Sequence, residues 1–384
     1  MKSEMKKNQL DHKNYSIKGV THRIIENSNG LKMHTLDSGF ISSEQEVVLL
    51  LHGFPELAFS WRHVIYPLIN NGYRVIAPDQ RGYGMTTGGS NSYNCDLSSF
   101  QVQNLVIDLL GLLFKIGVTS VKSVIGHDFG AYVAAYCALI RPDIFKSTII
   151  MSAPFGGPPS LSPLKEKHTI ETQNINEDLK NLSPPRKHYH WYYTTKTANA
   201  DMHNCPQGIH NFLRAYFHYK SADWVQNKPF PLINWSAQEL AKLPSYYIMD
   251  LNKGMAETVS NEMPSPKKID TCSWLSEEEL SVYSSTFNST GFQGGLNWYR
   301  CRLSPAFTKE LAIFSERQID VPSYFIGGQK DWGIHQSPGS FEAMSHKSCS
   351  NFKGYYLIES SGHWVQQEQP KVVSNLFLKF LADL

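Results

Sequence analysis

The sequence predicts an α/β fold in which helices cover both faces of a mostly parallel β-sheet. Short, continuously apolar runs recur along the chain, and such runs are typical of strands buried on both faces of a sheet. Segments with apolar residues at helical spacing separate them, and strands that alternate with helices form parallel sheets. The chain has 384 residues, of which 41% are hydrophobic and 18% are charged. It is therefore long enough for two structural units with a sizeable core.

The charges and cysteines exclude several classes of function. The 36 Lys and Arg residues nearly balance 34 Asp and Glu residues, so we expect no nucleic-acid or membrane-surface partner. Six scattered cysteines without a C-x-x-C pair predict neither a disulfide scaffold nor a zinc site and suit the cytoplasm. The first residues lack the apolar core of a signal peptide, and no apolar run approaches the about 20 residues that span a bilayer. We expect a soluble, cytoplasmic protein.

In chain order, the first expected elements are two short strands joined by a turn at Ser28-Asn29-Gly30. The apolar runs predict the later strands, at residues 47–51, 73–79, 121–128, 146–154, 321–328 and 354–363. Helices are predicted at residues 100–116, at 129–140 and from Pro370 onward. Ser98 or Ser99 is expected to cap the first of these helices.

The alternation of strands and helices breaks between about residues 155 and 318. This stretch is rich in Tyr, Trp, Pro and Asn and contains no run typical of a buried parallel strand. We therefore expect residues 1–154 and 319–384 to form the sheet domain, and residues 155–318 to form a helical insertion, here called the cap segment. Within it, residues 243–259 have no role that the pattern assigns.

Reactive side chains follow three of the predicted strands, in the order Asp128, Asp331 and His363. Because the carboxyl ends of parallel strands meet at one edge of a sheet, we expect these side chains to lie close together. Asp128 stands in the sequence GHDFGA, and a turn this tight between strand and helix requires a positive φ, which Asp tolerates. The flanking glycines allow a close backbone approach. Alone, this motif fits a helix cap as well as a nucleophile; the His and Asp at later strand ends favour the nucleophile.

The G-x-D-x-G motif resembles the nucleophile elbow of the α/β-hydrolase fold, in which serine is the usual central residue. Together with HGFPE at 52–56 and RGYG at 81–84, it is similar to the soluble epoxide hydrolases of that fold. The resemblance covers most of the chain. It implies a mostly parallel, eight-stranded sheet with an inserted helical cap.

The resemblance also implies roles for individual residues. Asp128 would form a covalent ester with the substrate, and His363, oriented by Asp331, would activate the water that hydrolyses it. The backbone amides of Phe54 and Phe129 would form the oxyanion hole. Further pocket residues are expected to be His52, Pro55, Trp191, Tyr192 and Trp364. The sequence leaves the isomer of the peptide bond before Pro55 open.

Two aromatic stretches of the cap segment, KHYHWYY (187–193) and TGFQGGLNWYR (290–300), resemble those that carry the ring-opening tyrosines. They map to Tyr189 and Tyr299, with Tyr192 as a rival to Tyr189. Opening an epoxide releases an alkoxide, which needs a proton donor, and a neutral phenol can supply one. The reaction implied converts an epoxide and water to a vicinal diol without metal or cofactor. A monomer and a homodimer are both compatible with the sequence.

Two other functions remain open at this point. Haloalkane and haloacid dehalogenases of the same fold share the aspartate nucleophile, and haloacid-type relatives resemble the Tyr-His-Trp run at 189–191. Against them, Phe129 has no N–H for halide, and no arginine closely follows Asp128. Most epoxide hydrolases carry Trp at the position of Phe129, so this chain departs from both patterns. A non-catalytic, ligand-binding relative is a third possibility, although all three triad positions are filled here.

Overall fold

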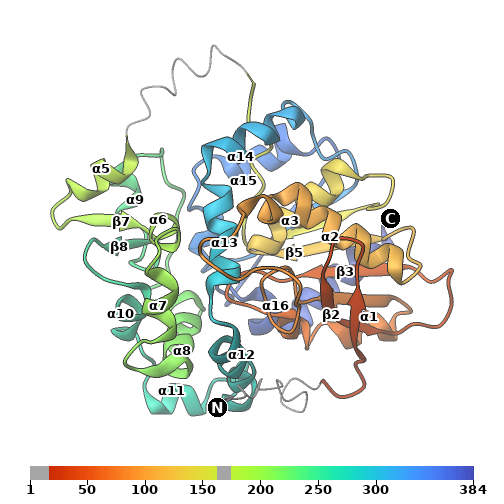
Figure 1. The fold of residues 1–384 in the computed structure, drawn as a ribbon, viewed down its shortest axis with the longest axis horizontal. Helices are drawn as coiled ribbons and strands as arrows, with labels where there is room; N and C mark the ends of the chain where they lie inside the picture. Colours follow the sequence, from red (N-terminus) through yellow and green to blue (C-terminus); the bar gives the residue numbers. More distant parts are fainter. Residues whose placement is uncertain (1–16, 162–173) are drawn as a thin grey trace, which may run out of the picture.

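An eight-stranded sheet runs through the structure, a computed structural model that describes residues 17–161 and 174–384 (Figure 1). Its strand order is β1-β2-β4-β3-β5-β6-β9-β10. The pairs β1-β2 and β2-β4 are antiparallel and the other five pairs are parallel, which confirms the predicted fold class. The strands are β1 (His22–Glu26), β2 (Lys32–Ser38), β3 (Val47–Leu51), β4 (Arg74–Pro78), β5 (Ser123–His127), β6 (Thr148–Met151), β9 (Ser323–Gly328) and β10 (Phe352–Ile358).

The central strands are covered on both faces. Every residue of β3, β4, β5 and β6 is buried, as their continuous apolar runs predict. Helices α2 (Val102–Lys115) and α3 (Phe129–Ile140) contact each other, and α1 (Ile65–Asn70) contacts the last helix, α17 (Pro370–Ala382). None of the described helices is long and apolar enough to cross a membrane. The predicted bounds of the helix at 129–140 and the start of the last helix at Pro370 are confirmed.

The predicted serine cap of α2 is wrong. A 3-10 turn, Leu97–Phe100, precedes α2, and its cap is Asp96, whose carboxylate accepts a bond from the amide of Ser98. The Ser98 hydroxyl donates to Asp96, 2.5 Å away, and among the described residues no side chain caps α2. Gln101 stands directly before α2 and makes no side-chain capping bond. Ser98 and Ser99 lie one turn too early because the chain inserts the 3-10 turn before the helix.

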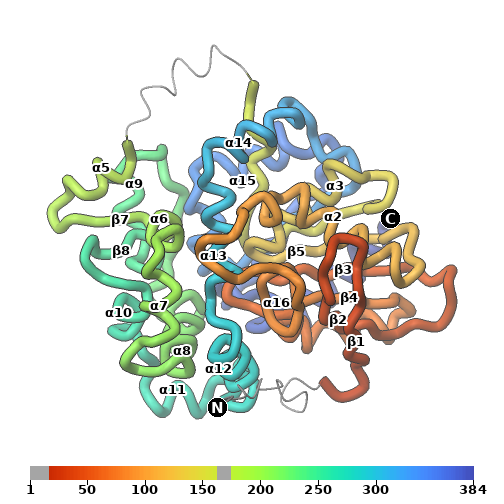
Figure 2. Tube along the Cα trace, viewed as in Figure 1, coloured from red at the N-terminus to blue at the C-terminus, as the bar shows by residue number. Residues whose placement is uncertain are grey.

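The described residues between β6 and β9 contain helices and one antiparallel strand pair, β7 (Arg186–His188) with β8 (Ile248–Asp250). Most of these elements lie to one side of the sheet, and α13 lies between them and the strands (Figures 1 and 2). The residues 243–259, to which the sequence assigned no role, contain β8 and most of α10. The division into a sheet domain and a cap segment at residues 155 and 318 stays a prediction.

The helices of this region are α5 (Ile175–Lys180), α6 (Tyr189–Tyr193), α7 (Ala198–His203), α8 (Gly208–Lys220), α9 (Ala237–Leu240), α10 (Met255–Ser260), α11 (Pro266–Asp270), α12 (Glu277–Thr290), α13 (Gln293–Arg302) and α14 (Pro305–Glu310). Two short helices, α15 (Ser340–Ala343) and α16 (Val365–Glu368), follow in the sheet domain. Arg62 joins the two parts, since its guanidinium donates to Glu279 of α12 at 2.7 Å and to Gln367 of α16 at 2.8 Å.

The passage from β5 to α3 is a tight junction of the sheet. A Cβ atom on Gly126 would lie 2.1 Å from the carbonyl oxygen of Gly130, and one on Gly130 would lie 2.2 Å from that of Leu51. Both contacts are with backbone atoms, which cannot rotate away. Glycine at these positions therefore allows α3 to start directly against β5 and β3.

We expect Gly130→Ala to lower the free energy of unfolding by at least about 3 kcal/mol, because the new methyl group overlaps two backbone carbonyls. Urea denaturation followed by circular dichroism measures the change. Gly89→Ala is the matched control, since its Cβ would meet atoms no closer than 3.5 Å. Equal stability of the two variants would contradict the close packing of β5 and α3.

Candidate active site

Asp128 forms the turn between β5 and α3 with a φ of 53°, as the tight motif predicts. Its side chain makes no capping bond to α3, which removes the alternative that it only caps this helix. Instead, its Oδ1 accepts a bond of 3.0 Å from the amide of Phe54. Phe54 precedes Pro55 through a cis peptide bond. The carboxylate is thus held across the junction of two strand-end loops; a contribution from the amide of Phe129 stays a prediction.

The three predicted residues from different strand ends meet in the structure. Nε2 of His363 lies 3.3 Å from Oδ2 of Asp128, and its Nδ1 lies 3.0 Å from both carboxylate oxygens of Asp331. A carboxylate only accepts, so Nδ1 donates to Asp331 and Nε2 is the ring atom that faces Asp128. Asp331 is itself fixed by a bond of 2.7 Å from the amide of Gly333. All three side chains are buried or nearly so.

The charges in this group determine its protonation. Burial alone would raise the pKa of Asp128, but the hydrogen bond and charge of His363 hold it below the ordinary carboxyl range. The pKa of Asp331 is lowered too, because the charge and hydrogen bond of His363 and the Gly333 amide outweigh burial. Burial would lower the pKa of His363, but Asp331 and Asp128 raise it. Both carboxylates are therefore ionised at neutral pH.

A narrow cavity of about 40 Å³ opens beside Asp128, with room for about three water molecules. Its lining comes from the turn after β5, the loop after β6, the cap segment and the loop after β9. The lining residues are Asp128, Phe129, Ala153, Pro154, Tyr189, His190, Tyr299, Arg302, Gly333, Gln336 and Ser337. Asp128 and the two predicted tyrosines thus share one cavity.

Tyr189 and Tyr299 approach Asp128 from α6 and α13. Burial, followed by the charge of Asp128, raises the pKa of each phenol well above its ordinary value, so each keeps its proton. The Tyr189 hydroxyl donates to Oε1 of Gln336 at 3.0 Å. The rival Tyr192 points elsewhere, because its hydroxyl donates to Asp201 at 3.3 Å. Geometry therefore favours Tyr189 over Tyr192.

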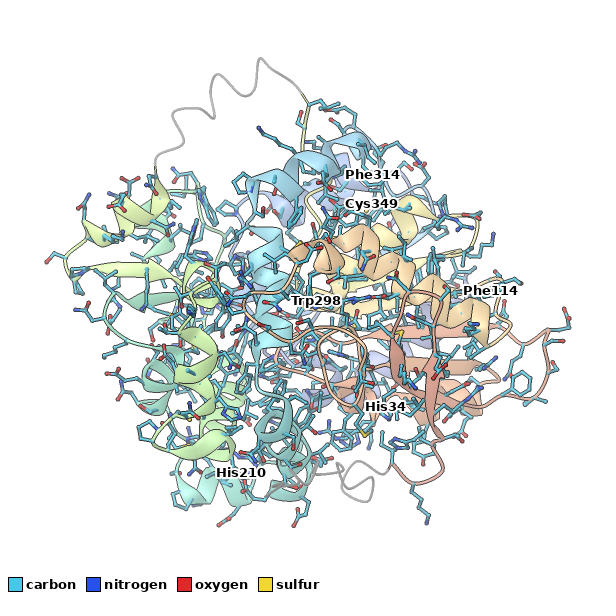
Figure 3. The ribbon with its side chains drawn as sticks, in the orientation of Figure 1. His34, Phe114, His210, Trp298, Phe314 and Cys349 are labelled. Atoms are coloured by element: carbon cyan, nitrogen blue, oxygen red, sulfur yellow. The ribbon has the colours of Figure 1, made fainter. Side chains whose placement is uncertain are left out.

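The side chain of Phe129 packs between the cavity and helix α13. Its ring meets those of Tyr299 and Trp298 edge to face, with centroids 4.8 and 5.4 Å apart. Trp298, labelled in Figure 3, reaches from α13 toward the sheet domain, where its indole N–H donates to the carbonyl of Arg81 at 2.9 Å. These contacts hold Tyr299, the next residue of α13, over Asp128.

The structure does not bring the five further pocket residues to this cavity. His52 and Trp364 are fully buried and bond to backbone groups of Gln80 and Phe217. Pro55 lies in the loop after β3, and Trp191 and Tyr192 lie in α6. None of the three lines the cavity. In their places the lining contains residues that the sequence did not single out, among them Gln336 and Arg302.

No group of three or more His, Cys, Asp or Glu side chains in the described ranges is arranged to hold a metal ion. The polar side chains that line the cavity are those of Asp128, Tyr189, His190, Tyr299, Arg302, Gln336 and Ser337, and Nε2 of His363 lies 3.3 Å from Asp128. The carboxylate can attack a substrate carbon, the phenols can donate a proton, and the imidazole of His363 can accept one.

Comparison with known proteins agrees with the fold. The profile of the alpha/beta hydrolase fold matches residues 46–370. Epoxide hydrolase 3 of Siraitia grosvenorii is 32% identical over 356 residues, which cover 91% of this chain and 94% of that protein. The chain belongs to the epoxide hydrolases of this fold family.

Other members of this family are similar over nearly their whole length. Epoxide hydrolase A of Mycobacterium tuberculosis is 30% identical over 370 residues, or 95% of this chain and 98% of that protein. The structure of potato epoxide hydrolase I aligns with a TM-score of 0.72 at 30% identity, covering 95% of this chain and all 100% of that one. An epoxide hydrolase from an endophytic Streptomyces aligns with a TM-score of 0.76 at 26% identity, covering 95% and 96%.

A buried polar network behind the triad of this family member was missed by sequence reasoning. His127 donates from Nε2 to the carbonyl of His363 at 2.7 Å, and its Nδ1 lies 2.6 Å from Glu56. Both ring nitrogens of His127 thus face oxygen atoms of other residues. Glu56 also accepts from Gln366 and Gln367, at 2.9 and 3.0 Å. The network fixes the backbone of His363. Only the position of Glu56 in HGFPE could have signalled it.

We expect Glu56→Gln to lower the free energy of unfolding by about 2–4 kcal/mol, because four donors surround the carboxylate and an amide offers them one oxygen. The fourth donor is the amide of Gly53, 3.1 Å away. Chemical denaturation measures the loss. The exposed Glu44→Gln is the matched control, which we expect to change stability by less than about 0.5 kcal/mol. A neutral effect at position 56 would contradict the network.

Proposed function

We propose that this chain hydrolyses an epoxide to a vicinal diol through a covalent ester on Asp128. The observation that carries the proposal is that an ionised carboxylate and two protonated phenols line one cavity, while a carboxylate-bound imidazole lies 3.3 Å from the first carboxylate. Membership in the epoxide hydrolases supports the same reaction.

In the first half-reaction, an oxygen of Asp128 attacks one epoxide carbon from the side opposite the C–O bond. Tyr189 and Tyr299 hold the epoxide oxygen by hydrogen bonds and one of them donates its proton as the C–O bond breaks. For this step Tyr189 exchanges its bond to Gln336 for one to the substrate. The product is a hydroxyalkyl ester of Asp128.

In the second half-reaction, Nε2 of His363 takes a proton from a water molecule that attacks the ester carbonyl of Asp128. Asp331 holds the imidazole by its Nδ1 and stabilises the positive charge that forms. The amide of Phe54, already 3.0 Å from Oδ1, stabilises the oxyanion together with that of Phe129. The tetrahedral intermediate collapses, the leaving alkoxide takes the proton from His363, and the diol leaves. Asp128 keeps one oxygen from water, and the proton of its carboxylic acid returns to the tyrosinate.

Dehalogenation by the same nucleophile is the second candidate, and the cavity gives it less support. A halide leaving group needs N–H donors, which His190 and Arg302 offer in the cavity but Phe129, the residue after Asp128, does not. Phenols fit an alkoxide, which requires a proton, better than a halide, which does not.

A single-turnover reaction in heavy-oxygen water tests the proposal. With styrene oxide as substrate, we expect the label in the Asp128 carboxyl group and not in the first diol formed, as read by peptide mass spectrometry. Asp128→Asn should reduce diol formation by at least about 1,000-fold, while the exposed control Asp143→Asn should not. Label in the first diol, or halide release from haloalkanes without any diol from epoxides, would contradict it.

A further inference from the structure

Lys220, the last residue of α8, is a buried cation whose backbone contacts that of His363. Only 3% of its surface is exposed. Its ammonium lies over four aromatic rings at centroid distances of 5.1 to 5.8 Å. Those rings belong to Tyr216, Tyr246, Tyr247 and Trp364. Such a cage favours a cation over a neutral amine.

This lysine differs from the other buried cations in how its charge is balanced. The buried arginines of the described ranges each pair with a carboxylate: Arg62 with Glu279, Arg74 with Asp37, Arg81 with Asp108 and Arg214 with Glu277. No carboxylate of residues 17–161 and 174–384 lies within 4.0 Å of the Lys220 ammonium. A buried charge without a carboxylate partner is costly, so the aromatic rings and more distant charges stabilise it.

Lys220 is linked to the triad through its backbone. The carbonyl of Lys220 accepts a bond of 2.9 Å from the amide of His363, and the Trp364 ring under the ammonium belongs to the next residue. After the larger effects of burial and of His363, the positive charge of Lys220 contributes to the lowered pKa values of Asp128 and Asp331. Lys220 thus bonds the backbone of His363, and its charge interacts with the carboxylates of Asp128 and Asp331.

The charged groups around His363 change its pKa in opposite directions. Asp331 after β9 and Asp128 after β5 favour its protonated form, whereas Lys220 at the end of α8 disfavours it. The ring of His127 in β5 lies 5.0 Å away, centroid to centroid. The carboxylate of Glu368 bonds the amides on both sides of His363, those of Gly362 and Trp364.

We propose that Lys220 is a positioning residue for the triad: its caged ammonium opposes the protonation of His363 that the two carboxylates favour, and so increases the share of the neutral ring. The inference rests on the proposed function, since only a neutral His363 can take the proton from water. A protonated ring 3.3 Å from Asp128 would also hold the carboxylate in an ion pair. The charge of Lys220 therefore favours both half-reactions, although Lys220 does not contact the substrate.

Direct titration of His363 tests this role independently of activity. We would label the histidines with carbon-13 at Cε1, assign His363 by its loss in His363→Gln, and follow its chemical shift against pH. In Lys220→Met, which keeps the apolar stem, we expect the titration midpoint of His363 to rise by about 1 pH unit, because a nearby positive charge is lost. Lys220→Arg keeps the charge and should stay within about 0.3 unit of the wild type.

Lys146→Met is the matched control, because it removes an exposed lysine charge and should leave the midpoint unchanged. Lys220→Gln replaces the Met variant if circular dichroism shows that the latter is unfolded. An unmoved midpoint in the neutral variants, or an equal shift in Lys220→Arg, would overturn the proposal. Activity adds a second readout: the acid limb of the pH–rate profile should move up with the midpoint. A wild type that makes no diol defeats the proposed function, while the titration still decides the role of Lys220.

Discussion

The backbone of Asp128 adopts a φ of 53° between a fully buried strand and a helix that starts at the next residue. This turn exists only because Gly126 and Gly130 leave no Cβ where two backbones come within van der Waals contact. The same close approach places the carboxylate opposite the amide of Phe54. The geometry of the nucleophile thus follows from backbone packing, and the positions of the other site residues are defined relative to it.

Around this turn, buried charges are arranged so that each is offset. Two carboxylates face His363 from different strands, the Glu56–His127 pair holds its backbone, and the ammonium of Lys220 lies behind it. Removing water from such a site strengthens each of these interactions. The cavity is correspondingly small, and its phenols remain protonated because burial and the charge of Asp128 raise their pKa values. Electrostatics and packing therefore act together: the tyrosines of the cap segment can donate protons, and His363 of the sheet domain can accept them.

The sequence was sufficient for the strands, because continuous apolar runs mark their burial, and for the triad, because parallel strands end at one edge. It was insufficient for the start of α2, where an inserted 3-10 turn, capped by Asp96, separates the two serines from the helix. The sequence also did not predict which residues line the cavity, because side-chain direction depends on tertiary packing. That packing brings in residues such as Gln336. Lys220 carried no signal at all, because its aromatic cage assembles from segments far apart in the chain.

The central claim is that a carboxylate of this chain becomes covalently bonded to its substrate. It is tested most directly by trapping the ester in His363→Gln, a variant that keeps Asp128 and loses the base for the second half-reaction. After incubation with styrene oxide and proteolysis, we predict that the peptide containing Asp128 gains the mass of the whole epoxide, with fragmentation locating the addition on that side chain. An unmodified peptide, or an adduct on any other residue, would contradict the account.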